Sequence, residues 1–206
     1  MIFESRNPAT EEVVEVLEGL SDEQLQATLQ QSAQAVPLWQ NYSFEQRTEL
    51  LLKVASLLRE RRENLAQLMS EEMGKLLREA LGEVDKCAQA CEYYAEHTPA
   101  MLNDQQIETH AKNSFISFEP LGTILAIMPW NFPLWQVFRF LAPTLMTGNT
   151  ALLKHAPEVP RCAKAIEGIL QDAGTPEGVF SSLLISVEQT AAVITDPRVQ
   201  GVAFTG

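Results

Sequence analysis

Apolar side chains in the first hundred residues recur at the three- and four-residue spacing of amphipathic helices. Residues 21–24 and 43–46 each place a serine three positions before a glutamine, which is the capping-box pattern of a helix start. We expect the first helix to end at Pro37, because proline lacks the N–H that a helix interior needs. A third helix is predicted over residues 76–96, ending before Pro99. This part of the chain is therefore expected to be largely helical.

The period changes between residues 105 and 119, where apolar and polar side chains alternate on both sides of Lys112-Asn113. Alternation about a polar turn predicts a β-hairpin. A two-stranded hairpin is only marginally stable by itself in water. We therefore expect this hairpin to pair with a partner subunit or with a strand outside this chain.

From Gly122 onward, short apolar runs alternate with amphipathic segments. Strands are predicted over residues 123–128, 150–154, 179–185 and 199–204, and helices over residues 134–146, 159–173 and 187–195. This alternation predicts an α/β fold with a parallel, doubly wound sheet and right-handed crossovers. A parallel sheet needs cover on both faces, and no helix follows the last predicted strand. We therefore expect the chain to be cut within its own domain.

Charge and composition exclude several classes of protein. The 206 residues include 15 basic and 27 acidic side chains, a net charge of -12, which disfavours nucleic acid as a partner because phosphate contacts need clustered cations. The one basic cluster, residues 59–62, is interrupted by Glu60 and is better explained as a solvated helix face. No apolar run reaches the roughly 20 residues of a membrane span, and the N-terminus has no signal pattern. We expect a cytoplasmic protein.

The three cysteines indicate neither a disulfide framework nor a metal site. Cys87 and Cys91 share one face of a predicted helix, without a histidine at zinc-binding spacing. Cys162 opens a different helix. None of them has a neighbouring base or glycine-rich turn that would activate a nucleophile. We expect three buried, unreactive thiols.

Three polar features are predicted to follow the carboxyl ends of strands: residues 129–131, Lys154, and Thr205-Gly206. Ligands of open α/β sheets bind along that edge. An asparagine amide there can donate to a developing oxyanion, and main-chain N–H groups at a helix start can bind a pyrophosphate. Each feature alone has an ordinary explanation, since Lys154 suits a solvated strand end and Trp130 suits a core. No GxGxxG fingerprint is present, so their joint placement is the basis of the interpretation.

These motifs resemble, in this order, those of aldehyde dehydrogenases. The resemblance rests on Pro129-Trp130-Asn131-Phe132-Pro133, Gly148-Asn149 with Lys154, Gly178-Val179-Phe180, Phe204-Thr205-Gly206, and the opening Asn7-Pro8-Ala9-Thr10-Glu11. It spans essentially the whole chain. It implies the N-terminal part of the aldehyde dehydrogenase fold, with N-terminal helices and an incomplete Rossmann-like parallel sheet. Residues 1–104 and 120–206 would form a truncated cofactor-binding domain, residues 105–119 an oligomerisation hairpin, and the catalytic domain would be absent.

The resemblance also implies roles around residue 131. Asn131 matches the side-chain amide of the oxyanion hole, which holds the thiohemiacetal and thioester oxygen. Met128, Pro129 and Trp130, together with Asn131, match the wall beside the nicotinamide ribose. In the family mechanism a cysteine thiolate attacks the aldehyde, the amide stabilises the oxyanion, hydride passes to the nicotinamide, and water hydrolyses the thioester.

The resemblance implies NAD or NADP as the cofactor. Lys154 matches the lysine that contacts the adenosine ribose or its 2′-phosphate, and Gly206 matches the first glycine of the helix that receives the pyrophosphate. NAD-preferring relatives place a glutamate three residues after that lysine, where this sequence has Pro157, and Glu158 comes one residue too late. Ser186-Val187 stands where many relatives have glycines near the adenine ribose. A 2′-phosphate is therefore expected to be repelled less strongly than in strict NAD enzymes.

Within the family, residues 128–136 and 153–157 look most like succinate-semialdehyde dehydrogenases that accept NAD or NADP. Arg139 matches the residue that clamps the distal carboxylate of that substrate, and a guanidinium forks well onto a carboxylate. The alternative is an interfacial arginine that lies along its helix. The resemblance implies a small aldehyde with a carboxylate as substrate, and a homo-oligomer when the protein is full length.

The family's catalytic cysteine and general-base glutamate have no counterpart in these 206 residues. We therefore expect the chain to be inactive alone. One alternative is a non-catalytic fragment that binds a nucleotide or pairs with another subunit. Another is a semialdehyde reductase of the acyl-phosphate type, which shares the fold, although the Trp-Asn-Phe-Pro sequence favours the dehydrogenase branch.

Overall fold

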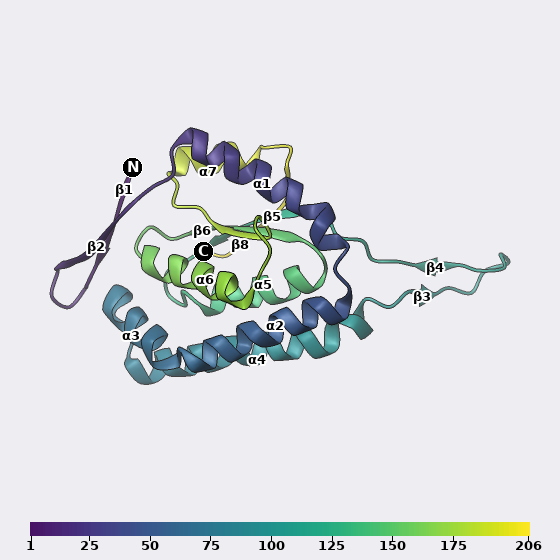
Figure 1. The fold of residues 1–206 in the computed structure, drawn as a ribbon, viewed down its shortest axis with the longest axis horizontal. Helices are drawn as coiled ribbons and strands as arrows, with labels where there is room; N and C mark the ends of the chain where they lie inside the picture. The colour runs from purple at the N-terminus through teal and green to yellow at the C-terminus, as the bar shows by residue number, and fades with distance from the viewer.

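A computed structural model describes all of residues 1–206. Its centre is a four-stranded parallel sheet with the order β7-β6-β5-β8. The strands are β5 (Thr123–Met128), β6 (Thr150–His155), β7 (Phe180–Ser182) and β8 (Val199–Phe204). The predicted α/β fold with a parallel sheet is therefore confirmed, and β5 and β6 are the inner strands. Figure 1 shows helices on both sides of this sheet and a hairpin projecting at each end of the molecule.

Helices cover the two faces of the sheet. On one face lie α1 (Asp22–Gln40) and α7 (Val187–Ile194), whose apolar side chains pack on Leu125 and Leu152. On the other face lie α5 (Trp135–Met146) and α6 (Pro160–Ala173), which form most of the larger core (Figure 1). These four helices include the three predicted between the strands, with ends that differ by one residue.

A further helical layer packs on α5 and α6. It consists of α2 (Phe44–Glu60), α3 (Arg62–Met73) and α4 (Leu77–Met101). Both predicted capping boxes are present, at Ser21 and Ser43, where the serine hydroxyl accepts from the main chain and the glutamine reaches back. The expectation of a helical N-terminal region is confirmed for residues 22–101.

The predicted helix ends at Pro37 and before Pro99 are wrong, because both prolines lie inside helices. Proline at position 99 leaves the carbonyl of Ala95 without its helical donor, and the Thr48 hydroxyl donates to that oxygen instead at 3.0 Å. Beyond Pro37, the indole of Trp39 is fully buried and anchors the last turn. Tertiary contacts therefore outweigh the local preference at both sites.

A hairpin formed by β1 (Ile2–Arg6) and β2 (Val13–Glu18) precedes the helices and is not among the elements predicted from the sequence. In β1 only Phe3 and Ser5 are buried, and β2 is almost wholly exposed. The apolar alternation that predicts a strand is weak here, because only one strand contributes buried side chains.

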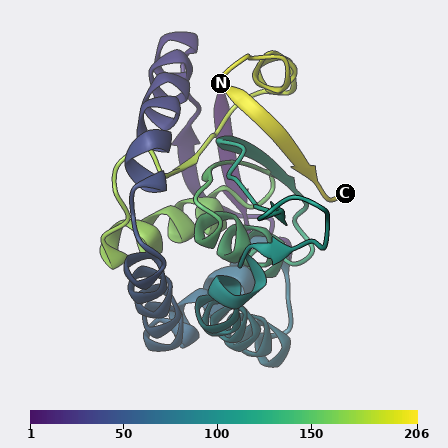
Figure 2. The ribbon, with the colours of Figure 1, turned by 90° about the vertical axis from the view of Figure 1, so that its right-hand side faces the viewer.

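The predicted strand over residues 179–185 is reduced to three residues. The last hydrogen bond to β6 runs from Leu183 N to Leu153 O. One residue later, the carbonyl of Leu184 accepts from Leu20 N instead of from β6. The chain leaves the sheet there to meet the segment before α1. At the opposite edge, the last strand β8 exposes Val202 and Phe204, as expected for a strand without a following helix (Figure 2, yellow).

The hairpin expected over residues 105–119 is present as β3 (Gln105–Gln106) and β4 (Phe115–Ile116). It projects from the body of the chain, and its apolar side chains at Ile107, Phe115, Ile116 and Phe118 are exposed (Figure 1). Its assignment as an oligomerisation element, like the domain boundaries, stays a prediction.

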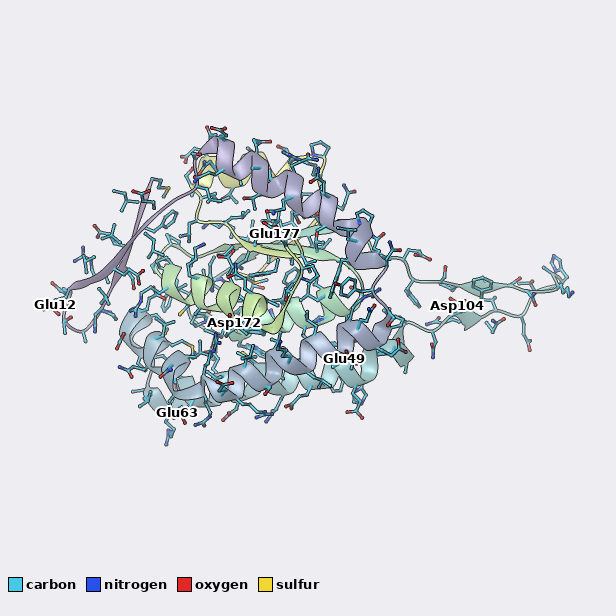
Figure 3. The ribbon with its side chains drawn as sticks, in the orientation of Figure 1. Glu12, Glu49, Glu63, Asp104, Asp172 and Glu177 are labelled. Carbon is cyan, nitrogen blue, oxygen red and sulfur yellow. The ribbon has the colours of Figure 1, made fainter.

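The basic cluster at residues 59–62 lies against acidic partners. The arginines form ion pairs from Arg59 to Glu92, from Arg61 to Asp172 and from Arg62 to Asp85. Figure 3 shows labelled acidic side chains on several sides of the molecule, so the net charge of -12 is not gathered at one site. None of the helices is long and apolar enough to cross a membrane.

Candidate functional site

The carboxyl ends of β5, β6 and β8 meet at one edge of the sheet. In the strand register, Ile127 of β5 lies beside Lys154 on one side and Phe204 on the other. Thr205 N donates to Ile127 O at 3.0 Å, so the residues after β8 stay attached to this edge. The structure thus brings together the loop after β5, Lys154 and Thr205-Gly206, while the roles implied for them stay predictions.

The loop that contains Asn131 is held by side chains from the helical layer. Lys75 Nζ donates to Asn131 O at 3.0 Å. Glu83 Oε1 accepts from Leu134 N and Trp135 N, each at 2.9 Å, at the start of α5. The Asn131 side chain itself is exposed. The main chain of this loop is therefore fixed, and the Asn131 amide is accessible to a ligand.

His155, the last residue of β6, also holds the loop that contains Asn131. Its Nε2 bonds to Pro133 O at 2.8 Å, and its Nδ1 accepts from Ala156 N at 2.9 Å. Since Nδ1 accepts a main-chain N–H, the proton lies on Nε2 and the ring is neutral. Burial lowers the pKa of His155 from 6.5 to about 4.

We expect the chain to become less stable as the pH decreases, because of His155. The pKa of His155 is about 4 in the folded chain and 6.5 in the unfolded chain. As the pH falls, the unfolded chain is therefore protonated at His155 before the folded chain is, which favours unfolding. The contribution is fully present above pH 6.5, declines as the pH falls to about 4, and amounts to about 3 kcal/mol at most. Urea unfolding across this window measures it. His155→Gln, which keeps an amide donor for Pro133 O, should show a flatter pH dependence; an equal slope would contradict the assignment.

Lys154 lies on the face of β6 opposite His155, and α7 packs above it. The side chain is half-buried, and burial lowers the pKa of its ammonium, partly opposed by Glu158. A cavity of about 270 Å³ opens here, lined by Ile127, Lys154, Val187, Thr190, Ala191 and Ile194. Apolar walls with one cation suit a planar base joined to a ribose or phosphate.

Sequence reasoning placed Val187 near the adenine ribose but did not identify the other α7 residues of this cavity. Val187, Thr190, Ala191 and Ile194 follow the spacing of one helix face. That face of a helix expected over residues 187–195 lies beside the carboxyl ends of the strands. The periodic signal was therefore present in the sequence and could have identified these lining residues.

Trp130 and Pro157 line a different cavity, of about 450 Å³, between the β1–β2 hairpin and the loops that follow β5 and β6. Its other lining residues are Glu4, Arg6, Pro8, Glu72, Met73 and Glu158. The structure therefore does not place Trp130 and Pro157 on the wall of the Lys154 cavity. They lie on the other side of the same sheet edge, where carboxylates outnumber cations.

Met128 and Pro129 connect β5 to this edge. Met128 is buried, and its carbonyl accepts from Ala156 N at 3.0 Å, which ties the loops after β5 and β6 together. Arg139 is exposed on α5, and its Nη2 donates to Thr205 Oγ1 at 3.3 Å. Arg139 therefore lies beside Thr205 at the end of β8, and its role stays a prediction.

The three cysteines are buried, as expected. Burial raises the pKa of all three thiols, so thiolates are disfavoured at neutral pH. No group of three or more His, Cys, Asp or Glu side chains could hold a metal ion. The three thiols are therefore unsuited to nucleophilic attack at neutral pH.

Comparison with known proteins finds one matching family model and relatives with similar names. The model of the family described as "Aldehyde dehydrogenase family" matches residues 1–206. A probable NADP(+) succinate-semialdehyde dehydrogenase of Synechocystis is 45% identical over 100% of this chain and 45% of its own length. The NAD(P)+ succinate semialdehyde dehydrogenase Sad of Escherichia coli is 42% identical over 98% of this chain and 44% of its own.

Solved structures agree with the fold. The succinic semialdehyde dehydrogenase of Streptococcus pyogenes, crystallised with NADP+, matches with a TM-score of 0.94 and 36% identity, over 97% of this chain and 44% of that one. The structure of Gox0499 matches with a TM-score of 0.96 and 35% identity, over 98% and 44%. The expected N-terminal part of the aldehyde dehydrogenase fold is confirmed, and the chain spans less than half the length of the curated relatives described.

Proposed function

This chain belongs to the aldehyde dehydrogenase family, and from that premise we propose that its protein oxidises an aldehyde that carries a carboxylate. Succinate semialdehyde is the favoured substrate, because relatives at 45% and 42% identity are named for it. The observation that supports the proposal best is the single sheet edge at which the fixed Asn131 loop meets Lys154 and Thr205-Gly206.

Asn131 is proposed as the oxyanion donor. Lys75 and Glu83 fix its loop, and the exposed amide can donate to an oxygen that gains charge during attack on the aldehyde. The nucleophile is not one of the three cysteines of this chain, because their thiols are buried with raised pKa values. These 206 residues therefore supply the oxyanion donor and part of the nucleotide site, and we propose that they are inactive alone.

NADP is the proposed cofactor, with NAD accepted; when bound it supplies the hydride acceptor. Lys154 provides a cation at the mouth of the cavity beside α7, where a ribose 2′-phosphate can be reached. Pro157 places no carboxylate where strict NAD enzymes of the family have one. The names of the relatives from Synechocystis and Escherichia coli, and the NADP+ complex from Streptococcus pyogenes, favour the same choice.

Arg139 is proposed to bind the carboxylate of the aldehyde. The guanidinium is exposed, has no carboxylate partner, and donates one hydrogen bond to Thr205 Oγ1. Its remaining donors are free to fork onto a substrate carboxylate. A substrate with a distal carboxylate would then be held at one end while its aldehyde lies near Asn131.

The hairpin of β3 and β4 is proposed to pair subunits, giving a homo-oligomer. Its strand edges and exposed apolar side chains, Phe115, Ile116 and Phe118 among them, are otherwise uncovered. The same feature favours the second candidate function, a subunit-pairing fragment without catalysis. Aldehyde oxidation by the native-length protein separates the two.

We expect the protein at its native length to oxidise succinate semialdehyde with NADP, and butyraldehyde, which lacks the carboxylate, far less efficiently. Loss of one charge-assisted clamp is worth about 1.5–3 kcal/mol, or roughly 10- to 100-fold in kcat/KM. Formation of the reduced nicotinamide, followed by absorbance, measures both rates, and the 206-residue chain serves as the inactive control. No oxidation of either aldehyde would contradict the proposal, and equal rates would contradict the carboxylate specificity.

A further inference from the structure

The connector between α3 and α4 lies directly against the Asn131 loop. Gly74 ends α3 in the left-handed conformation, with φ of 75°, which turns the chain so that Lys75 points back under the loop. The side chain of Lys75 is only 6% exposed, and that of Glu83, from the second turn of α4, is 1% exposed. The two form an ion pair almost completely removed from water.

Glu83 caps α5 from another helix. No side chain near Leu134 in the sequence caps this helix start. One carboxylate oxygen of Glu83 accepts both Leu134 N and Trp135 N, and the other accepts from Lys75. A negative charge at the first turn also suits the positive end of the helix dipole. Glu83 thereby fixes where α5 begins and the direction in which the loop enters it.

Lys75 holds the same loop nearer its start, at Asn131 and Phe132. Its ammonium donates to Asn131 O at 3.0 Å and lies 3.7 Å from the centre of the Phe132 ring. The cation, the carbonyl and the ring therefore fix the main chain on both sides of the peptide bond after Asn131. The main chain at Asn131 sets where its exposed side chain leaves the loop, and so which directions the amide can reach.

A buried ion pair is an expensive way to stabilise a fold, because desolvation offsets much of the attraction. Here every partner of the pair belongs to one short loop, residues 131–135. The contacts constrain the geometry of this loop more than they add apolar burial. That pattern is typical of a group whose task is to orient a neighbouring functional residue.

We propose that Lys75 and Glu83 are positioning residues that set the direction of the Asn131 amide, an inference that rests on the proposed function of Asn131. An oxyanion donor acts only as charge develops on the aldehyde oxygen, so its misplacement lowers kcat and leaves nucleotide affinity almost unchanged. A displacement of about 1 Å in such a group costs up to roughly 100-fold in rate.

The test compares the native-length protein with the double variant Lys75→Met/Glu83→Gln, which removes both charges and keeps similar volumes. We expect kcat with succinate semialdehyde and NADP to fall roughly 10- to 100-fold, while the KM for NADP stays within about threefold. Amide hydrogen exchange at Leu134 and Trp135 should quicken at least tenfold, since both amides lose their charged acceptor.

Glu167→Gln is the matched control. Glu167 also pairs with a lysine, Lys164, at 2.8 Å and accepts a main-chain N–H, from Ser182, at 2.8 Å, but it lies beside β7 at the far edge of the sheet. We expect this variant to keep the wild-type kcat. If the double variant matches it in both kcat and exchange, the positioning role is overturned.

Two further outcomes are informative. If the double variant does not fold, the test uses Lys75→Arg instead. Arginine keeps the positive charge, but its planar guanidinium places the donors differently from an ammonium. A kcat equal to that of the wild type would then overturn the proposal. If the wild type oxidises no aldehyde, the proposed function fails independently. Exchange at Leu134 and Trp135 then still decides whether the ion pair holds the loop.

Discussion

Replacing Asn131 by alanine is expected to lower kcat for aldehyde oxidation by about 100- to 1,000-fold, the usual loss when one oxyanion-hole donor is removed. The loop keeps its fixed main chain, since Lys75 and Glu83 contact only main-chain atoms at Asn131 and the start of α5. The lost amide would therefore affect the transition state more than the fold. Steady-state kinetics of the native-length protein with succinate semialdehyde and NADP measure the effect, and the KM for NADP should change little.

Two controls sharpen this prediction. Asn131→Asp has nearly the same shape but replaces the donor by a negative charge, and we expect it to be at least as inactive as the alanine variant. Asn113→Ala removes an exposed amide from the turn of the β3–β4 hairpin and should leave kcat unchanged. A loss of less than about threefold for Asn131→Ala would exclude the amide as a main source of the roughly 3–4 kcal/mol expected from an oxyanion donor.

The sequence predicts best where structure is determined locally. Strands β5 and β8 are found over the predicted residues, and α7 differs by one, because each has a compact apolar pattern bounded by turns. The ends of α1 and α4 were wrong, since the contacts that keep Pro37 and Pro99 helical come from distant segments. The Thr48 hydroxyl that replaces the missing donor at Ala95 O is 47 residues away in sequence.

The site shows the same division. The alternation of strands and helices was sufficient to place Asn131, Lys154 and Gly206 at one edge of the sheet, because parallel strands present their carboxyl ends together. Nothing in the local sequence indicates Lys75 or Glu83, which lie 56 and 51 residues from the positions they contact. Their part in the site follows only from how α4 packs on α5.

Replacing Trp39 by alanine is expected to reduce the free energy of unfolding by about 3–5 kcal/mol, the range for truncating a buried large aromatic side chain. Trp39 is 0% exposed, packs between α1 and α5, and donates from Nε1 to Leu145 O at 3.1 Å. The guanidinium of Arg47 lies 6.0 Å from the ring and would face the cavity. Urea unfolding of the 206-residue chain, followed by circular dichroism, measures the loss.

The neighbouring residue provides the control for this position. Leu38 is 65% exposed in the same helical turn after Pro37, so Leu38→Ala should change stability by no more than about 0.5 kcal/mol. Trp39→Phe keeps much of the ring volume and removes one of two donors to Leu145 O, which still accepts from Gly148 N at 3.0 Å, so it should cost only about 0.5–1.5 kcal/mol. If Trp39→Ala costs no more than Leu38→Ala, the indole does not anchor the last turn of α1, and the explanation for a helix that continues through Pro37 is wrong.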